Sequence, residues 1–372
     1  MHVTVIEPYT TGSHAVWLAG LRQFSRHEVA ALTLPGRFWK WRMHGGAVAL
    51  GRLFLEQVGH TDLLLATDML DLATFLGVTR AKTNRLPTAI YFHENQLTYP
   101  PPPGEKHDLH YGWINYTSAL VADQVFFNSA HHRDEFLEEL PRLLKHFPDY
   151  TELKTVGSIA AKSTVLPLGL DLRRFDDYRP AERAPGPLRI VWNHRWEYDK
   201  GPETFFRALT ALAEMGAAFE VIVLGEDFRQ QPQEFLSAKR QLESQIRHFG
   251  YAEDFATYAR LLWEGDVQVS CAIQEFFGAS TCEAMYCDCM PIAPNRLNYP
   301  ALIPGWARPT CLYEDFDGLV RRLQWASENP TRVREITLRE AAASYDWAGL
   351  IGAYDDALAE AAAIPGPDRS RI

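Results

Sequence analysis

Two carboxylates stand eight positions apart around an aromatic-glycine turn, in the stretch Glu275-Phe-Phe-Gly-Ala-Ser-Thr-Cys-Glu283. The apolar run 267–272 before it predicts a strand, and residues 279–285 predict a helix. A glycine turn that opens a helix directs free backbone N–H groups and the positive end of the helix dipole at one point, which suits a phosphate. Carboxylates that flank such a turn can accept hydrogen bonds from sugar hydroxyls. The stretch therefore predicts a nucleotide-sugar pocket.

A pair of cations follows a second predicted strand. The predicted strand spans residues 188–192, and the loop after it contains Arg195 and Lys200. In an open α/β sheet this loop faces the ligand crevice, where a guanidinium and an ammonium can neutralise a diphosphate and stabilise it as it leaves. The alternative is a pair of solvated loop charges. Their position after a strand, in the same half as the two carboxylates, favours the diphosphate.

Two polar stretches follow predicted strands in the first half of the chain. After the apolar run 88–92 come His93, Glu94, Asn95 and Gln96. A single His there is more often structural, but four successive polar residues favour contacts with a sugar or an acceptor. The first strand–helix turn consists of Gly12, Ser13 and His14. Glycine permits a ligand to approach the backbone closely, and an ordinary turn with an N-cap is an equal alternative.

Cations alternate with aromatic residues between positions 36 and 44. The alternating residues are Arg37, Phe38, Trp39, Lys40, Trp41 and Arg42. Arg and Lys can hold phosphates while aromatic rings stack on exposed bases. From the sequence alone, a solvated amphipathic loop explains this segment equally well.

The apolar pattern predicts two arrays of alternating strands and helices. Unbroken apolar runs fit strands that are buried on both faces of a parallel sheet. They occur at 3–6, 29–32, 63–66, 88–92, 124–127 and 164–168, and further strands are expected at 188–192, 219–224 and 267–270. Helices are expected at 15–24, 130–140, 203–215, 235–249 and 254–262. The fold class is therefore α/β, with two doubly wound domains that bind ligands at the carboxyl ends of their strands.

The domain boundary is predicted from a Pro-rich stretch. Residues 179–187 have no periodicity and are interpreted as an interdomain linker. We expect an N-terminal Rossmann-like domain over 1–180 that presents the acceptor and a C-terminal one over 188–345 that binds the donor. Residues 346–372 should contain a helix that packs back on the first domain, followed by a tail.

Composition limits the class of protein. At 372 residues, with 47% hydrophobic and 23% charged residues, the chain is typical of soluble globular proteins of two domains. Its net charge of −10 argues against a surface that is basic throughout, although a local basic patch stays possible. The sequence has no signal-peptide pattern and no apolar run near the ~18 residues of a membrane span, so a cytoplasmic location is expected. No oligomeric state is indicated.

Three of the five cysteines crowd together at Cys282, Cys287 and Cys289. Their spacing is not the C-x2-C pair of a zinc site, and no second cluster matches it. Buried reduced thiols are therefore favoured, and no metal is expected.

The Arg195–Lys200 loop and the Glu275–Glu283 stretch together resemble glycosyltransferase family 4. Members have the GT-B architecture, in which two Rossmann-like domains face a central cleft. By this resemblance Arg195 and Lys200 would bind the donor diphosphate, Glu275 the sugar hydroxyls and Glu283 the ribose. Further donor contacts would come from Gly12, Ser13, Gly225, Gly250, Tyr251, Phe277, Gly278, Ala279 and Ser280. The family retains the anomeric configuration and usually needs no metal.

Longer stretches are similar to the tRNA-queuosine alpha-mannosyltransferase family, from residue 7 to about residue 304. They lie at 34–42, 92–100, 192–200, 249–255 and 296–300. The resemblance implies transfer of mannose from GDP-mannose to the cyclopentene-diol of queuosine in a tRNA anticodon, with His93 at the donor sugar. Acceptor contacts would come from His14, Arg37, Trp39, Lys40, Arg42, Glu94, Asn95 and Gln96. One departure is Asn193, where the family pattern has Pro.

Two other functions stay open at this point. A different donor sugar would use a similar Glu275 pocket, and a lipid or polysaccharide acceptor is possible, although the chain lacks the Lys-rich amphipathic face that membrane binding favours. A non-catalytic tRNA-binding module could keep the fold, but it would not need all of Arg195, Lys200, Glu275 and Glu283. Since no convincing nucleophile is found, the expected mechanism is attack by the acceptor hydroxyl from the same face, with its proton passing to the leaving phosphate.

Overall fold

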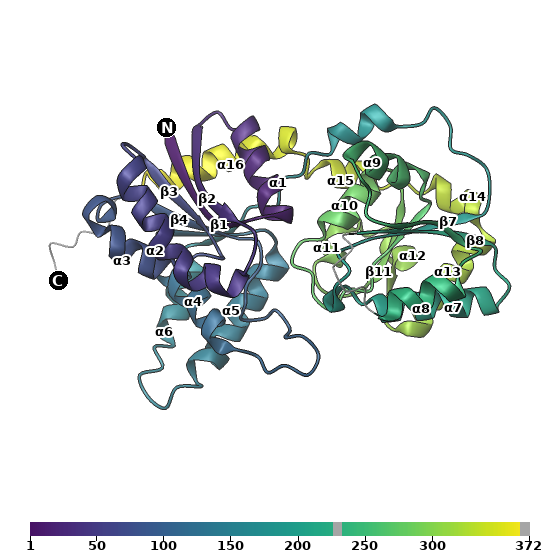
Figure 1. Cartoon of the computed structure of the whole chain (residues 1–372), viewed down its shortest axis with the longest axis horizontal. Helices are drawn as coiled ribbons and strands as arrows, with labels where there is room; N and C mark the ends of the chain where they lie inside the picture. The colour runs from purple at the N-terminus through teal and green to yellow at the C-terminus, as the bar shows by residue number, and fades with distance from the viewer. Residues whose placement is uncertain (226–232, 365–372) are drawn as a thin grey trace. The chain divides into compact units, whose positions relative to one another are not determined.

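The computed structural model describes residues 1–225 and 233–364, which form two compact units (Figure 1). The first unit consists of Met1–Leu170 and Trp347–Ile372, and the second of Asp171–Asp346. The chain thus divides at Leu170, and the Pro-rich segment expected to be a linker lies within the second unit. The expected tail beyond residue 364 lies outside the described residues.

The first unit is built on a six-stranded parallel sheet. In order across the sheet its strands are β2 (Glu28–Pro35), β1 (His2–Thr10), β3 (Leu63–Thr67), β4 (Thr88–Phe92), β5 (Gln124–Phe127) and β6 (Ser163–Val165). All five pairings are parallel. Every residue of β3 and β4 is buried, as the unbroken apolar runs predict. The strand order reverses beside β1, so its carboxyl end lies at a topological switch point, where α/β sheets bind ligands.

Helices pack on both faces of this sheet. They are α1 (Gly12–Phe24), α2 (Trp39–Gln57), α3 (Leu72–Thr83), α4 (Leu109–Val121), α5 (Ala130–Leu144), α6 (Lys154–Ala161) and α16 (Trp347–Ala362). On one face Leu50 and Phe54 of α2 join Leu64 and Ile90 of the sheet in a buried core. Helix α16 packs on β3, β4 and α1, and its Tyr354 hydroxyl accepts a hydrogen bond from Trp17 Nε1 at 3.1 Å.

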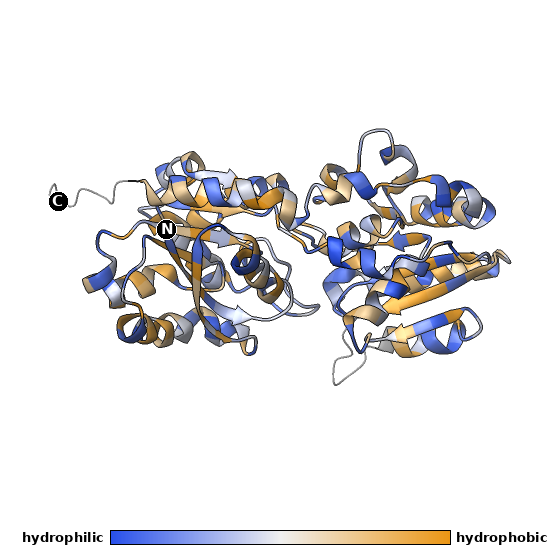
Figure 2. Cartoon of the chain, turned by 90° about the horizontal axis from the view of Figure 1, so that it is seen from above, coloured by the Kyte–Doolittle hydropathy of each residue, from blue (hydrophilic) through white to orange (hydrophobic). Residues whose placement is uncertain are grey.

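The second unit repeats the plan. In order across its sheet the strands are β12 (Leu312–Tyr313), β11 (Met290–Pro294), β10 (Val267–Val269), β7 (Leu188–Asn193), β8 (Phe219–Leu224) and β9 (Ile246–Gly250). All five pairings are again parallel, and the strands are mostly orange in Figure 2 because apolar residues fill the core. Two parallel six-stranded sheets with helices confirm the predicted α/β class.

The helices of the second unit differ in length. The longer ones are α7 (Pro202–Glu214), α8 (Gln233–Gln241), α9 (Phe255–Glu264), α10 (Ala279–Tyr286) and α13 (Phe316–Glu328). The shorter ones are the 3-10 turns η1 (Arg173–Tyr178) and η2 (Tyr198–Lys200) and the helices α11 (Tyr299–Leu302), α12 (Arg308–Cys311), α14 (Pro330–Glu335) and α15 (Arg339–Ala343). The single helix predicted over 235–249 is wrong, because strand β9 follows α8. Residues Ile246–Gly250 pair with Val221–Leu224 of β8, and this pairing places the half-buried stretch at the edge of the sheet.

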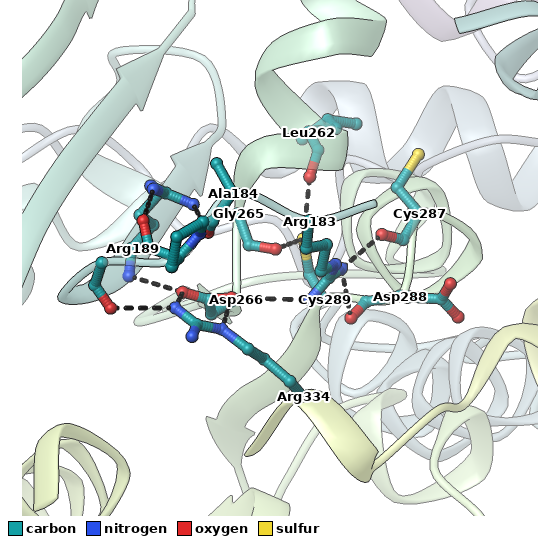
Figure 3. A network of polar contacts seen from close by, with 12 residues as sticks. Arg183, Ala184, Arg189, Leu262, Gly265, Asp266, Cys287, Asp288, Cys289 and Arg334 are labelled. Atoms are coloured by element: carbon teal, nitrogen blue, oxygen red, sulfur yellow. Dashed lines mark hydrogen bonds and ion pairs between the residues drawn. The ribbon is translucent and has the colours of Figure 1, made fainter. Parts of the chain in front are cut away.

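A buried carboxylate ties the Pro-rich segment to the second unit (Figure 3). Asp266, which is 0% exposed, accepts hydrogen bonds from the backbone N–H of Arg189 at 3.0 Å and from Nε and Nη2 of Arg334 at 2.8 and 3.0 Å. Arg183 Nη1 lies 3.5 Å from the same carboxylate, and its Nη2 donates to the carbonyl of Asp288 at 2.9 Å. A buried charge requires such partners. They hold the start of β7 beside the start of β10.

Candidate active site

Lys200 and Glu275 meet at the carboxyl ends of β7 and β10. Lys200 ends η2, and its Nζ lies 3.2 Å from Glu275 Oε2 and 3.1 Å from Asp199 Oδ2. The same ammonium donates a hydrogen bond to the carbonyl oxygen of Gln274 at 3.1 Å. The structure thus brings together two residues that sequence analysis assigned to one pocket. It adds Asp199, which sequence analysis missed.

The ammonium and its two carboxylates stabilise one another's charge. Burial opposes the charge on Lys200, but Glu275 and Asp199 outweigh it and raise the pKa of the ammonium. Burial also opposes the charge on Glu275, and there Lys200 outweighs it and lowers the pKa of the carboxyl. Both groups are therefore charged at neutral pH. A fixed ammonium beside a carboxylate can attract a phosphate and orient a sugar hydroxyl at the same time.

Glu275 also organises the glycine turn. Its Oε1 accepts hydrogen bonds from the backbone N–H of Phe277 at 3.4 Å and of Gly278 at 3.1 Å. Gly278 is the N-cap of α10 with φ 103°, and a Cβ there would lie 2.7 Å from Leu302 Cδ1, so only glycine fits. The N–H groups of the next turn, at Ala279 and Ser280, have no partner within the helix. They stay candidates for donor phosphate contacts.

A hydrogen-bond network links Glu283 to β7. Glu283 Oε2 accepts a hydrogen bond from the Tyr258 hydroxyl at 2.6 Å, and burial raises the pKa of Glu283. Asn193 Nδ2 donates to the Tyr258 hydroxyl at 3.2 Å and to the Ser280 carbonyl at 2.9 Å. The residue that departs from the family pattern therefore joins the carboxylate of α10 to the strand that carries the cationic loop. His194 is neutral here, since burial and the nearby Lys200 lower its pKa to about 4.

The remaining predicted donor residues of the second unit end or follow strands β7, β8 and β9 or precede α10, whereas Gly12 and Ser13 begin α1 of the first unit. Arg195 is exposed, its Nη2 lies 3.2 Å from Glu197 Oε2, and its charge acts on Lys200. Gly225 directly follows β8 with φ 142°, and a Cβ there would lie 2.1 Å from the carbonyl oxygen of His194. Gly250 ends β9, and Tyr251 after it is 63% exposed. Phe277, by contrast, is buried against the Tyr345 ring, at 5.1 Å between centroids.

In the first unit, Glu7, His14 and His93 form a buried group at the carboxyl ends of β1 and β4. Glu7 Oε2 lies 2.9 Å from His14 Nδ1, and the His14 and His93 rings lie 4.1 Å apart between centroids. Asp68, directly after β3, accepts a hydrogen bond from the backbone N–H of His93 at 2.8 Å. The donor atoms of the first three residues lie within 4.8 Å of one another, a spacing that also fits a metal ion. Since Glu7 and His14 bond directly to each other, we describe them as an ion pair.

Glu7 and Asp68 were not predicted as site residues from the sequence. Their only signal is a carboxylate inside or directly after an apolar strand, a position where an uncompensated charge is costly. Burial raises the pKa of Asp68 to about 8, although the nearby His14 opposes this shift.

Asn95 and Gln96 shape the loop after His93. Asn95 is 0% exposed, and its Oδ1 accepts hydrogen bonds from the backbone N–H of Leu97 at 3.0 Å and of Thr98 at 2.9 Å. Gln96 Nε2 donates to Glu94 Oε1 at 2.7 Å. Asn95 therefore holds the turn, and Glu94 and Gln96, which are both half-buried, are more accessible than Asn95.

The basic-aromatic segment begins helix α2. Phe38 is its N-cap in the left-handed region, with φ 57°, and is 74% exposed. Trp41 is 63% exposed, whereas Trp39 is half-buried, with its ring 5.0 Å from that of Tyr111. Arg42 Nε donates to the Pro35 carbonyl at 3.2 Å. The exposed rings are thus Phe38 and Trp41, beside the exposed cations of Arg37 and Lys40.

The cysteines are free and buried, as predicted. Burial raises the pKa of Cys282 and Cys287, and that of Cys289 to about 12. Such thiols stay protonated and unreactive. Among the described residues no helix is long and apolar enough to cross a membrane.

Known proteins share this architecture. The chain resembles the sucrose-phosphate synthase of Thermosynechococcus elongatus with a TM-score of 0.70 and 13% identity, over 97% of this chain and 98% of that one. It resembles Anabaena HepE, solved in complex with UDP, with a TM-score of 0.69 and 14% identity, over 97% and 100% of the two chains. The family model described as Glycosyl transferases group 1 matches residues 175–341. The chain is a glycosyltransferase with the GT-B fold, which confirms the predicted enzyme class.

Sequence relatives define the family more closely. The family model described as tRNA-queuosine alpha-mannosyltransferase N-terminal matches residues 2–170. A tRNA-queuosine alpha-mannosyltransferase of Drosophila melanogaster is 32% identical over 330 residues, which cover 87% of this chain and 86% of the relative. This chain belongs to the tRNA-queuosine alpha-mannosyltransferase family, as the sequence resemblance indicated.

Proposed function

We propose that this enzyme transfers mannose from GDP-mannose to the cyclopentene-diol of queuosine in a tRNA, with retention of the anomeric configuration. The observation that carries the proposal is the buried Asp199–Lys200–Glu275 group at the carboxyl end of the second sheet, in a chain of this family. Its fixed ammonium supplies the charge that a departing diphosphate needs, without a metal. Its carboxylate supplies an acceptor for sugar hydroxyls.

The donor would bind mainly through polar groups of the second unit. Lys200 and Arg195 would contact the diphosphate, together with the backbone N–H groups at the start of α10. Glu275 would accept hydrogen bonds from the mannose hydroxyls. Glu283, held by Tyr258, would accept them from the ribose.

The acceptor hydroxyl would replace the diphosphate on one face of the sugar. The bond from the anomeric carbon to the phosphate oxygen breaks, and a bond from that carbon to the acceptor oxygen forms on the same face. The acceptor proton passes to the departing phosphate oxygen. No protein nucleophile takes part, and the cations act by stabilising the charge that develops on GDP.

The start of α2 would bind the RNA. Phe38 and Trp41 present exposed rings on which unpaired bases can stack, and Arg37 and Lys40 present cations for phosphates. This arrangement modifies the sequence interpretation, because the half-buried Trp39 supports Tyr111 and leaves stacking to its neighbours.

The test is a donor panel. Queuosine-containing tRNA and the enzyme are incubated in four parallel reactions, one each with GDP-mannose, GDP-fucose, UDP-glucose and UDP-galactose. The tRNA is then digested, and the masses of its nucleosides are measured by mass spectrometry. The proposal predicts one added hexose, from GDP-mannose. Addition of a hexose only from a UDP-sugar would overturn the assignment of GDP-mannose as the donor. Modification of tRNA that lacks queuosine would overturn the assignment of queuosine as the acceptor.

A further inference from the structure

We propose that Glu7 and His14 are positioning residues for His93: the Glu7 carboxylate holds the His14 side chain, as an imidazolium, against the His93 ring, so that His93 presents a neutral imidazole in one fixed orientation to a sugar hydroxyl. This inference rests on the proposed function and on the role at the donor sugar that the family resemblance implies for His93. It assigns a task to two buried residues that the transfer reaction described above does not use.

The three side chains form a continuous buried line. Glu7 is 0% exposed in the middle of β1, and both its oxygens are occupied: Oε1 accepts from the backbone N–H of Tyr9 at 2.7 Å and Oε2 accepts from His14 Nδ1 at 2.9 Å. His14 is 5% exposed, and its ring lies 4.1 Å from that of His93 at an interplanar angle of 35°. Because Glu7 is fixed at both oxygens, it determines where the His14 ring lies.

His14 stands where a cation is unfavourable in the absence of carboxylates. It lies in the first turn of α1, at the positive end of the helix dipole, and it is buried. Burial lowers its pKa, but Glu7 in direct contact, with Asp68 and Glu94 nearby, raises the pKa overall to about 9. His14 is therefore an imidazolium at neutral pH, and Glu7 is the main cause.

His93 is held in the opposite charge state. Burial, then the charge of His14 and the proximity of His132, lower its pKa well below the usual value. The ring is clamped edge-on by Trp17, with centroids 4.9 Å apart at 86°, and lies 4.8 Å from that of Tyr91 at 61°. Its Nε2 is buried without a hydrogen-bond partner in the described structure. The titratable groups around the two histidines are Glu7, Tyr9, Asp68, Tyr91, Glu94 and His132.

A neutral His93 matters because only an uncharged imidazole has a nitrogen that accepts a hydrogen bond from a sugar hydroxyl. Two adjacent imidazoles in a buried site do not both take a proton, so a charged His14 excludes the charge from its neighbour. The pair thus fixes both the orientation and the protonation state of His93 before the donor arrives.

The test combines NMR of 15N-labelled histidine with kinetics in Glu7→Gln. Gln can still accept the hydrogen bond from Tyr9 but carries no charge. At pH 7.5 the wild type should show the imidazolium pattern for His14 and a neutral pattern for His93, each assigned from His14→Gln and His93→Gln spectra. In Glu7→Gln the His14 signal should become neutral. The kcat should fall about tenfold or more at little cost in donor KM, and the acid limb of the kcat profile should move to higher pH.

The matched control is Glu28→Gln, because Glu28 Oε2 also lies beside a histidine, 3.1 Å from His2 Nδ1, but on the exposed edge of the same sheet. It should change neither the spectra of His14 and His93 nor the pH profile. A neutral His14 in the wild type at pH 7.5 would overturn the inference. So would a Glu7→Gln enzyme whose melting temperature falls while its pH profile stays in place, or histidine signals that shift on adding Zn2+ and revert with a chelator. The NMR measurement reports the protonation states of His14 and His93 whichever donor the enzyme uses. A negative NMR result would therefore overturn this inference and leave the proposed function untouched.

Discussion

Replacing Lys200 by Met removes the one ammonium between Asp199 and Glu275 and tests the donor site most sharply. Two carboxylates would then face each other around a vacated position, each about 3 Å from where Nζ lay. Breaking a buried ion pair by removing one partner typically costs about 3–5 kcal/mol of folding free energy. Loss of one preorganised charge at a leaving group typically lowers kcat by about 10²–10³, which corresponds to about 3–4 kcal/mol. We therefore expect a folded but less stable enzyme whose kcat falls by at least about a hundredfold.

The assay measures single-turnover transfer to queuosine-containing tRNA at saturating donor, together with urea unfolding. The matched control is Lys162→Met, because Lys162 is also a partly buried lysine, which donates to the backbone carbonyl of Leu120 at 2.7 Å in the first unit. It should lower stability and leave kcat within about threefold. If Lys200→Met stays folded and turns over at a rate near that of the wild type, Lys200 does not stabilise the leaving diphosphate.

Three further predictions follow from the structure. Phe38→Ala and Trp41→Ala should each weaken tRNA binding by about 1–3 kcal/mol, measured by filter binding, without changing hydrolysis of the sugar nucleotide in the absence of tRNA. Asp266→Asn should lower the free energy of unfolding by about 3 kcal/mol, measured in urea, since it removes the charge that pairs with two arginines. Glu7→Gln should destabilise the protein most below pH 6.5 and least above pH 9, by up to about 3 kcal/mol, because the raised pKa of His14 contributes stability that is lost as pH rises from 6.5 to about 9.

The first two of these predictions have control variants. Trp306→Ala removes a ring that is 66% exposed in the second unit, and it should leave tRNA affinity unchanged. Asp288→Asn breaks a more exposed ion pair with Arg179 and should cost about 1 kcal/mol or less. The role of the exposed rings would be contradicted if Trp306→Ala lost as much tRNA affinity as Trp41→Ala. The role of Asp266 would be contradicted if Asp266→Asn were as stable as Asp288→Asn. The role of the Glu7–His14 pair would be contradicted if the loss of folding free energy in Glu7→Gln grew with pH.

The strands could be predicted because their residues are apolar without interruption. Both faces of β3 and β4 are buried, so each strand is a nearly continuous apolar run in the sequence. Strand β9 lies at the edge of its sheet and is only half-buried, so Ile246–Gly250 lacks that signal and was interpreted as helix. Edge strands gain their structure from pairing, which composition does not report.

The donor motif could be predicted in part, for a related reason. Lys200 and Glu275 follow strands, and parallel strands place their carboxyl ends together. Asp199 lies next to Lys200 but points into the same buried group, which only the fold reveals. Glu7 and Asp68 could not be recognised from the sequence, because only the pairing of β1, β3 and β4 brings them beside His14 and His93. Trp39 and Trp41 are alike in sequence, and the position of Tyr111 decides which of them is exposed.

If the enzyme transfers mannose with retention at the Lys200–Glu275 site, the mannose in the product keeps the α configuration that it has in the donor. Wild-type enzyme and Glu275→Gln are incubated with GDP-α-mannose and queuosine-containing tRNA, and the isolated nucleoside is analysed by NMR at its anomeric carbon. We expect α-linked mannose from the wild type and a product yield reduced at least about a hundredfold from Glu275→Gln. A β-linked product, or an undiminished yield from Glu275→Gln, would contradict it.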